Sequence, residues 1–154
     1  MATPCSCSTT DHCVYLGLGS NMGDRRATLL KAYKEIDRLV GPIVRQSAFL
    51  VSKPWGFRSD NDFLNSVVCC HTRLSPRQVL RVTQHIERSL GRRTKSAGGI
   101  YHDRPIDIDI LLYDHLRMAD PDLCIPHPLI LQRDFVWKPL LEVLPPPFFV
   151  PFIP

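Results

Sequence analysis

Hydrophobic residues occur along this chain with two different spacings. Four segments are nearly continuous apolar runs, as expected of buried strands, and they span residues 14–18, 43–51, 63–72 and 105–113. Two other segments, about 24–40 and 75–90, repeat their apolar residues every three or four positions, as amphipathic helices do. Ser75, Pro76 and Gln78 provide the second helix with an N-cap, a proline at the first helical position and the glutamine of a capping box.

The order of these elements predicts an α+β fold. The pattern βαββαβ is that of a ferredoxin-like core, with an antiparallel sheet, both helices on one face and long loops around its site. A doubly wound fold would need a helix between the strands at 43–51 and 63–72, and the sequence provides none there. Nine of the 14 prolines lie in 121–154, which predicts turns and extended chain rather than a helix. We expect a single domain over 1–154 with a flexible tail at 1–13.

The positive charge of the chain is concentrated in one segment. The 154 residues contain 19 lysines and arginines against 15 aspartates and glutamates, a formal net charge of +4. Residues 88–104 contain five basic residues and one acidic residue, which accounts for all of that charge. This segment has no periodic apolar residues, and long loops of that kind are usually functional or disordered. The rest of the chain is neutral overall, unlike a protein that coats nucleic acid.

The N-terminal residues and the cysteines indicate a cytoplasmic protein. Met1–Cys13 is polar and lacks the apolar core of a signal peptide, and no stretch reaches the ~18–20 apolar residues of a membrane span. The six cysteines are therefore expected to be reduced thiols. Cys5, Cys7, His12 and Cys13 are an alternative zinc site, although their spacing matches no standard zinc motif.

Two acidic residues interrupt the last apolar strand. Asp107 and Asp109 project from one strand face, roughly 7 Å apart along the chain. Their neighbours Ile108, Ile110 and Leu112 are expected to point the other way, into the core. Two carboxylates this close repel each other unless a cation lies between them, and Mg²⁺ shared with substrate phosphates fits that arrangement. The alternative is a solvated strand face.

Further chemistry is carried by an aromatic–amide pair and by cations. Phe63 and Asn65 share one face of their strand. There the ring could stack on a flat heterocycle, and the amide could hydrogen-bond to the donors and acceptors along its edge. The alternative is that Phe63 is a core residue and Asn65 lies at the edge of the sheet. Arg104 lies three residues before Asp107, so Mg²⁺ and arginine together could neutralise a polyphosphate. His127 lies between two prolines and could donate to a phosphate or merely cap a turn.

Several common nucleotide-binding motifs are absent. The sequence contains neither the GxxxxGK[ST] of a P-loop nor the protein-kinase set. Gly17, Gly19 and Gly23 have the wrong spacing for a dinucleotide fingerprint, so we interpret them as turn chemistry.

Together these residues resemble the hydroxymethyldihydropterin pyrophosphokinase family. The resemblance runs from Tyr15 to about Pro145 and rests on the following motifs: Gly19-Ser20-Asn21, Pro54-Trp55-Gly56, Asp62-Phe63-Leu64-Asn65, Glu87-x-x-x-Gly91-Arg92, Arg104-Pro105-Ile106-Asp107-Ile108-Asp109-Ile110 and Pro126-His127. It implies a ferredoxin-like enzyme that moves a pyrophosphoryl group from ATP to 6-hydroxymethyl-7,8-dihydropterin in folate biosynthesis, with AMP as the other product.

The resemblance also implies roles for individual residues. Two Mg²⁺ ions would be bound by Asp107 and Asp109. The pterin would contact Ser52, Lys53, Pro54, Trp55, Phe63, Asn65 and Phe135. ATP would contact Gln84, Glu87, Arg92, Tyr101, Arg104, Ile110 and His127. The catalytic residues at the phosphates would be Arg92, Arg104, His127 and Arg133. Two loops, 53–60 and 92–104, would close over the bound substrates.

The sequence departs from the family pattern at a few positions. His102 and Asp103 stand where the family usually has a small residue and often proline, and an acidic residue beside a phosphate site is unfavourable unless it points away or pairs with a cation. Tyr101 replaces a common tryptophan, and Pro128 replaces a common aromatic residue.

A rival interpretation is a nonenzymatic RNA-binding module, because ferredoxin-like sheets with exposed aromatics bind RNA. The paired aspartates would repel an RNA backbone, so we expect a protein that does not bind nucleic acid. We also expect a monomer that acts on small molecules and does not bind membranes.

Overall fold

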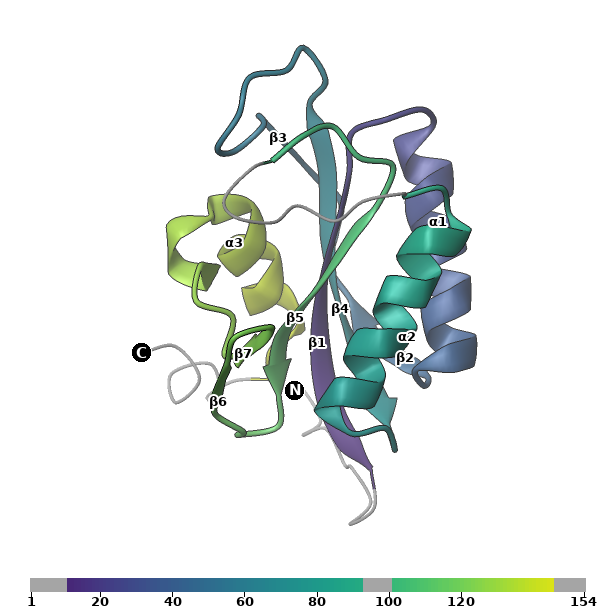
Figure 1. The fold of residues 1–154 in the computed structure, drawn as a ribbon, viewed down its shortest axis with the longest axis vertical. Helices are drawn as coiled ribbons and strands as arrows, with labels where there is room; N and C mark the ends of the chain where they lie inside the picture. The colour runs from purple at the N-terminus through teal and green to yellow at the C-terminus, as the bar shows by residue number, and fades with distance from the viewer. Residues whose placement is uncertain (1–10, 93–100, 146–154) are drawn as a thin grey trace.

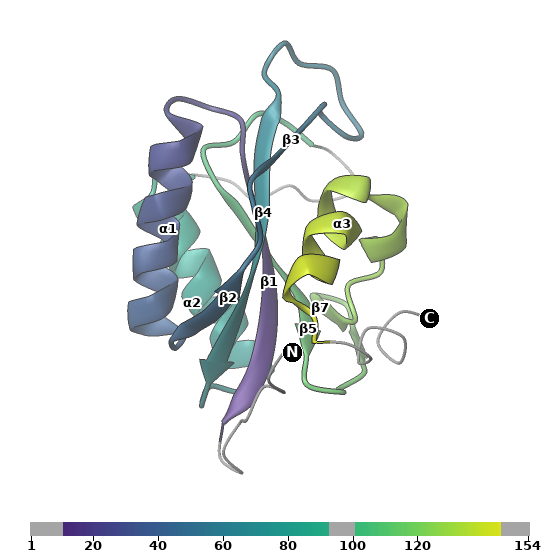
Figure 2. The same cartoon turned by 180° about the vertical axis from the view of Figure 1, so that it is seen from behind.

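The computed structural model of the protein describes residues 11–92 and 101–145, which form a central antiparallel sheet with helices on both faces (Figures 1 and 2). The strands of this sheet are β1 (His12–Ser20), β2 (Ile43–Gln46), β3 (Leu50–Ser52), β4 (Phe63–Thr72) and β5 (Asp107–Tyr113). Their order is β2-β4-β1-β5, and β3 also pairs with β4. The helices α1 (Arg25–Leu39) and α2 (Pro76–Ser89) cover one face, as predicted, and the ferredoxin-like core is confirmed.

The second predicted strand, 43–51, is divided into β2 and β3. Ser47 lies at the break, and its hydroxyl accepts a hydrogen bond from the Val67 N–H at 2.9 Å. The Ser47 N–H in turn donates to the Val67 carbonyl at 2.9 Å. Because a side-chain oxygen replaces a strand carbonyl here, the regular ladder to β4 is interrupted.

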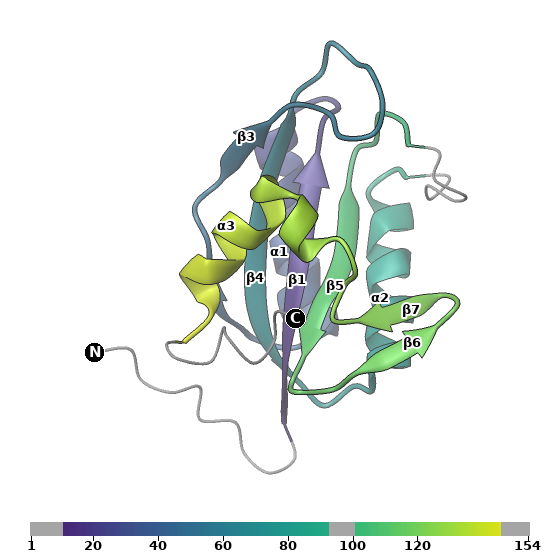
Figure 3. The same ribbon diagram turned by 90° about the vertical axis from the view of Figure 1, so that its left-hand side faces the viewer.

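The prediction of no helix in 121–154 is wrong, because α3 (Asp134–Val143) lies across the face of the sheet opposite α1 and α2 (Figure 3). Pro139 lies inside this helix, where a proline removes one backbone hydrogen bond. The helix forms nevertheless because Leu140 and Val143 are buried against Val67 and other apolar side chains of the sheet. A two-stranded hairpin, β6 (Met118–Asp120) and β7 (Leu123–Ile125), and a short 3₁₀ helix, η1 (Ile130–Gln132), precede α3.

A β-bulge changes the face of one predicted core residue. Leu16 pairs with Ile110 and Tyr15 pairs with Leu112, so Leu111 is an extra residue in β5. Leu112 therefore packs in the cluster under α3, not with Ile110 between the sheet and α1 and α2, as the simple alternation had predicted. The bulge follows the two aspartates and leaves their alternation intact.

Candidate active site

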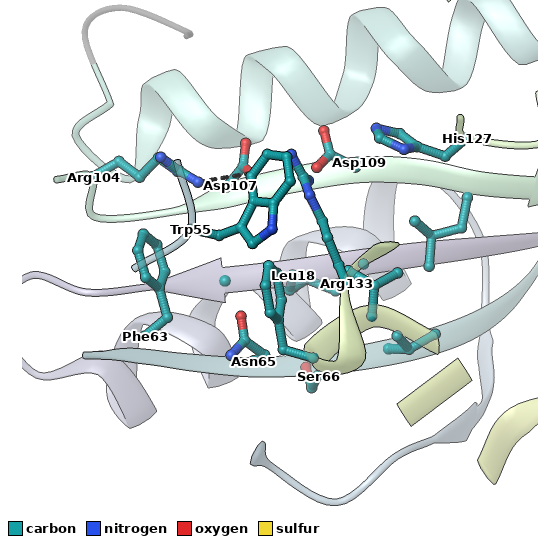
Figure 4. A pocket seen from close by; sticks show the side chains of 16 residues that line it. Leu18, Trp55, Phe63, Asn65, Ser66, Arg104, Asp107, Asp109, His127 and Arg133 are labelled. Carbon is teal, nitrogen blue, oxygen red and sulfur yellow. Dashed lines mark ion pairs between the residues drawn. The ribbon is translucent and has the colours of Figure 1, made fainter. Parts of the chain in front are cut away.

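A pocket lies on the face of the sheet that carries α3, beside the end of β1 and the start of β5 (Figure 4). Its space, counted together with the open mouth, is about 590 Å³. The pocket brings together nine residues that the sequence singled out: Trp55, Phe63, Asn65, Arg104, Asp107, Asp109, His127, Arg133 and Phe135.

The floor of the pocket is made by two glycines that the sequence analysis had interpreted as turn residues. Gly17 and Gly19 lie within β1, opposite Asp109 and Asp107 in the neighbouring strand. A Cβ atom at Gly19 would come within 3.2 Å of Asn65 Oδ1 and 3.5 Å of the Phe63 ring. The absence of a side chain at Gly19 therefore lets Asn65 and Phe63 pack close to β1, and the spacing of two glycines inside an apolar strand was the signal for such a close approach.

The two carboxylates share one face, as predicted, and both line the pocket (Figure 4). Asp107 is held from behind by the buried Arg92, whose Nη1 donates to Asp107 Oδ1 at 2.5 Å and to the Ile106 carbonyl at 3.1 Å. The same nitrogen lies 3.1 Å from Oε2 of the buried Glu87, which accepts the Ile108 N–H at 2.8 Å. Arg92 and Glu87 thus fix the strand that carries the aspartates.

Some residues with predicted ATP contacts lie outside this pocket. Arg92 and Glu87 are buried behind the Asp107 strand, and Ile110 packs in the core between the sheet and α1 and α2. Gln84 is half-buried on α2 and does not line the pocket. Their contacts with ATP stay predictions.

Two buried arginines form the cationic wall of the pocket. The Arg104 guanidinium lies 4.7 Å from the centre of the Phe63 ring, and that of Arg133 lies 4.3 Å from the Trp55 ring. Among the described residues, Nε of each arginine is buried without a hydrogen-bond partner. Buried donors are nearly always paired, so the pocket lacks an acceptor at these two positions.

The electrostatics of Arg104 also favour an anionic ligand. Burial lowers the pKa of Arg104 below its ordinary value, the charge of Arg92 adds to that effect, and Asp107 opposes it. Its Nη2 lies 3.7 Å from Asp107 Oδ2, a distance too long for a hydrogen bond. An anion placed against Arg104 would restore the solvation that burial removes.

A third part of the pocket presents hydrogen-bonding groups of fixed orientation. Asn65 Nδ2 donates to the Leu50 carbonyl at 3.0 Å and to Ser52 Oγ at 2.8 Å, so its oxygen is turned toward the pocket (Figure 4). The Leu129 N–H donates to His127 Nδ1 at 3.2 Å, which orients the imidazole ring toward Asp109. Both groups are therefore already oriented toward the space that a ligand would occupy.

The remaining predicted contacts lie in the loops at the mouth of the pocket. Tyr101 packs edge-on against Trp55 at 5.8 Å, and its hydroxyl accepts a hydrogen bond from Arg133 at 3.3 Å. Lys53 is exposed, 3.7 Å from Asp62, and Pro54 is half-buried; neither lines the pocket.

Other predictions fall wholly or partly outside the described residues. Cys5, Cys7 and residues 1–10 of the tail predicted over 1–13 lie outside them, as do residues 93–100 of the basic loop, whereas His12 and Cys13 of that tail begin β1. His12 Nδ1 lies 2.6 Å from Asp114, and the zinc alternative is not tested, because Cys5 and Cys7 lie outside the described residues. Within 11–92 and 101–145, no three histidine, cysteine or acidic side chains are grouped as metal ligands, so the Asp107–Asp109 pair has no third protein ligand in that part of the chain.

The fold and the site together define a class. A ferredoxin-like domain whose pocket combines aromatic rings, paired carboxylates and buried arginines is suited to an enzyme that transfers a phosphoryl-type group onto a flat heterocyclic substrate.

Comparison with known proteins identifies the family. A model of the family "7,8-dihydro-6-hydroxymethylpterin-pyrophosphokinase (HPPK)" matches residues 15–145. The chain is 50% identical over 133 residues to 2-amino-4-hydroxy-6-hydroxymethyldihydropteridine pyrophosphokinase of Porphyromonas gingivalis, covering 86% of this chain and 90% of the relative. It is 34% identical to the mitochondrial folate synthesis bifunctional protein of Arabidopsis thaliana, of which it covers 25%.

The fold comparison agrees. A solved structure of HPPK-DHPS in complex with substrates matches with a TM-score of 0.70 at 13% identity, over 88% of this chain and 40% of that one.

This chain belongs to the hydroxymethyldihydropterin pyrophosphokinase family. It is therefore a pyrophosphokinase of folate biosynthesis that uses ATP as co-substrate. No helix in the described part of the chain has the length and apolarity needed to cross a membrane.

Proposed function

We propose that the pocket is where the pyrophosphoryl group passes from MgATP to 6-hydroxymethyl-7,8-dihydropterin. The observation that carries the proposal is the pair of buried arginines, Arg104 and Arg133, which line the pocket beside two carboxylates and whose Nε atoms have no hydrogen-bond partner among the described residues. Cations held in a low-dielectric pocket and acidic groups that can hold Mg²⁺ are together what a polyphosphate needs.

The pterin ring would lie between Phe63 and Phe135 on the aromatic side of the pocket. The fixed oxygen of Asn65 would accept from an N–H of the pterin, and the chain from Ser52 to Trp55 would read the opposite edge. Arg104 lies over the Phe63 ring, so the pterin would displace that guanidinium toward the phosphates.

Asp107 and Asp109 would hold Mg²⁺, with two ions expected on the ATP phosphates. The residues fit such a metal: both donors are carboxylate oxygens that line the pocket, and each aspartate pairs with a glycine of β1. Bound Mg²⁺ would supply charge neutralisation for the β- and γ-phosphates.

The transfer would be a single in-line displacement without a covalent intermediate. The hydroxymethyl oxygen forms a bond to the β-phosphorus of ATP, the bond from that phosphorus to the α,β-bridging oxygen breaks, AMP leaves and the hydroxyl proton is released. Arg92, Arg104, His127 and Arg133 would stabilise or position the phosphates. The two loops at the pocket mouth would exclude water that could otherwise hydrolyse ATP.

The partners and location are also part of the proposal. We infer a cytoplasmic monomer that acts on small molecules and binds neither nucleic acid nor membrane. The acidic pair inside the pocket supports this choice over RNA, because a phosphate backbone would meet two negative charges there. Among the described residues, Cys13, Cys69, Cys70 and Cys124 form no disulfide.

The substitution Phe63→Ala tests the pterin side of the proposal. It removes one stacking surface, and a base-sized ring stacked on an aromatic side chain is worth about 1–3 kcal/mol, so the pterin Kd should rise ~5- to 150-fold. Isothermal calorimetry of pterin binding with a nonhydrolysable ATP analogue and Mg²⁺ present measures this change.

Phe49→Ala is the control, because Phe49 is a half-buried phenylalanine that packs against Tyr33, whereas Phe63 is buried and lines the pocket. It should leave the pterin Kd unchanged. An unchanged pterin affinity in the Phe63→Ala protein would remove Phe63 from the binding site and refute this placement of the pterin.

A further inference from the structure

Asp103 points away from the phosphate side of the pocket, although it immediately precedes Arg104. Its Oδ1 accepts a hydrogen bond from Asn21 Nδ2 at 2.8 Å, and its Oδ2 accepts one from Asn61 Nδ2 at 2.9 Å. Both carboxylate oxygens are thus bound by neutral donors of two other loops. The like-charge conflict expected from the sequence does not arise.

Asn21 connects this carboxylate to the backbone of Arg104. Asn21 is buried at the end of β1, and its Oδ1 accepts the Arg104 N–H at 2.8 Å. Its own N–H donates to the Arg104 carbonyl at 3.2 Å. The Asn21 amide therefore lies between the Asp103 carboxylate and the main chain of the residue that carries the pocket guanidinium.

Asn61 brings in the loop that carries Trp55. Its carbonyl accepts a second hydrogen bond from Asn21 Nδ2 at 3.2 Å, and its N–H donates to Ser59 Oγ at 3.1 Å. Hydrogen bonds from Ser59, Asn21 and Asn61 lower the pKa of Asp103, with Ser59 the largest contributor. Three segments therefore meet at one ionised carboxylate: the β1–α1 turn, the β3–β4 loop and the loop before β5.

We propose that Asp103 is a positioning residue that latches the β3–β4 loop to the loop before β5 and thereby holds the main chain of Arg104 beside the pocket of the free enzyme. The inference rests on the pyrophosphokinase function proposed for this pocket. Asp103 acts through Asn21 and Asn61 and touches no reacting group. The same two loops also meet at the edge-on contact of Trp55 with Tyr101, so loss of the carboxylate loosens the arrangement without removing it.

The latch predicts a kinetic signature that separates KM from kcat. If Asp103 raises the fraction of free enzyme in which the Arg104 main chain is in place, its loss weakens apparent substrate affinity by that fraction, while bound substrate restores the arrangement of the two loops. Asp103→Ala should raise the KM for ATP about tenfold, the effect of losing hydrogen bonds to one charged group, and leave kcat within about twofold. Asp103→Asn keeps one acceptor oxygen and should give a smaller rise.

The double variant shows whether Asp103 acts through Asn61. The rise in KM for Asp103→Ala combined with Asn61→Ala should be much smaller than the product of the two single rises, because the pair is already broken in each. Independent effects that multiply would contradict the latch.

The control is Asp37→Ala. Like Asp103, Asp37 joins two segments through a hydrogen bond that its carboxylate accepts; the donor is the Ile43 N–H at 2.9 Å. Asp37 is exposed and lies at the opposite end of the sheet. It should change neither kinetic constant.

Steady-state AMP formation by the wild type and these variants decides the matter. A wild-type chain that forms no AMP would overturn the proposed function. An active wild type with an unchanged KM in Asp103→Ala, or with a fall in kcat alone, would overturn the latch and leave the function standing.

Discussion

Replacing Asp107 or Asp109 by alanine should lower kcat by about 10²–10³-fold, the usual effect of removing one preorganised electrostatic partner from an active site. Both carboxylates face the pocket from one strand, opposite Gly19 and Gly17, and no third metal ligand joins them within the described residues. If the proposed Mg²⁺ site is correct, loss of either one would remove half of the carboxylates that hold the metal on the polyphosphate.

Asp107 has a second role that must be separated from the first. It accepts a hydrogen bond from the buried Arg92, so Asp107→Ala also leaves that guanidinium with one partner fewer. Asp107→Asn keeps an oxygen for Arg92 while removing the charge, so it should retain more of the stability and still lose turnover. The assay is AMP formation at saturating Mg²⁺, with the denaturation midpoint measured in parallel. Near-wild-type turnover in the alanine variants with Mg²⁺ not limiting would refute the metal role.

Replacing Glu87 by alanine should mainly destabilise the fold. Glu87 is 2% exposed, pairs with Arg92 at 3.1 Å and accepts the Ile108 N–H at 2.8 Å. Removing one partner of a buried ion pair leaves an incompletely compensated charge, which costs about 3–5 kcal/mol. Equilibrium urea denaturation should show this loss in the free energy of unfolding. The Glu87→Ala protein should therefore unfold more readily than the wild type at 37 °C.

Two further variants distinguish a structural role of Glu87 from a role in binding ATP. Glu87→Gln keeps an oxygen for the Ile108 N–H and should be less destabilised, with nucleotide affinity close to that of the wild type. Glu35→Ala breaks an ion pair with Arg38 of 2.6 Å on the surface of α1, where such pairs contribute about 0–1 kcal/mol. If Glu87→Gln folded normally but lost ATP affinity, Glu87 would be an ATP contact, as the family resemblance alone implies, and the structural role would be wrong.

The sequence predicted the elements whose signals are local. The capping box that starts α2 is present as expected, with Ser75 Oγ accepting from the Gln78 N–H at 3.2 Å and Gln78 Oε1 accepting from the Ser75 N–H at 2.8 Å. The alternation in β5 correctly placed Asp107 and Asp109 on one face, because strand geometry depends only on neighbouring residues.

What the sequence could not predict depends on residues far apart in the chain. Pro139 argued against a helix, and only the apolar surface of the sheet explains why α3 forms. The motif with Glu87 and Arg92 did not indicate that folding pairs these two side chains with each other behind Asp107; their contacts with ATP stay predictions. From the sequence, Asp103 looked unfavourable beside a phosphate site. The structure explains its presence, because its carboxylate accepts hydrogen bonds from Asn21 and Asn61 of two other loops.

The central claim is that this chain moves a pyrophosphoryl group, as one unit, to a pterin alcohol. The most direct measurement supplies ATP, Mg²⁺ and 6-hydroxymethyl-7,8-dihydropterin and separates the products by chromatography with ³¹P detection. The account predicts AMP and the pterin diphosphate in equal amounts, with neither formed when the pterin is omitted. Formation of ADP in place of AMP, or no AMP together with salt-dependent RNA binding, would contradict it.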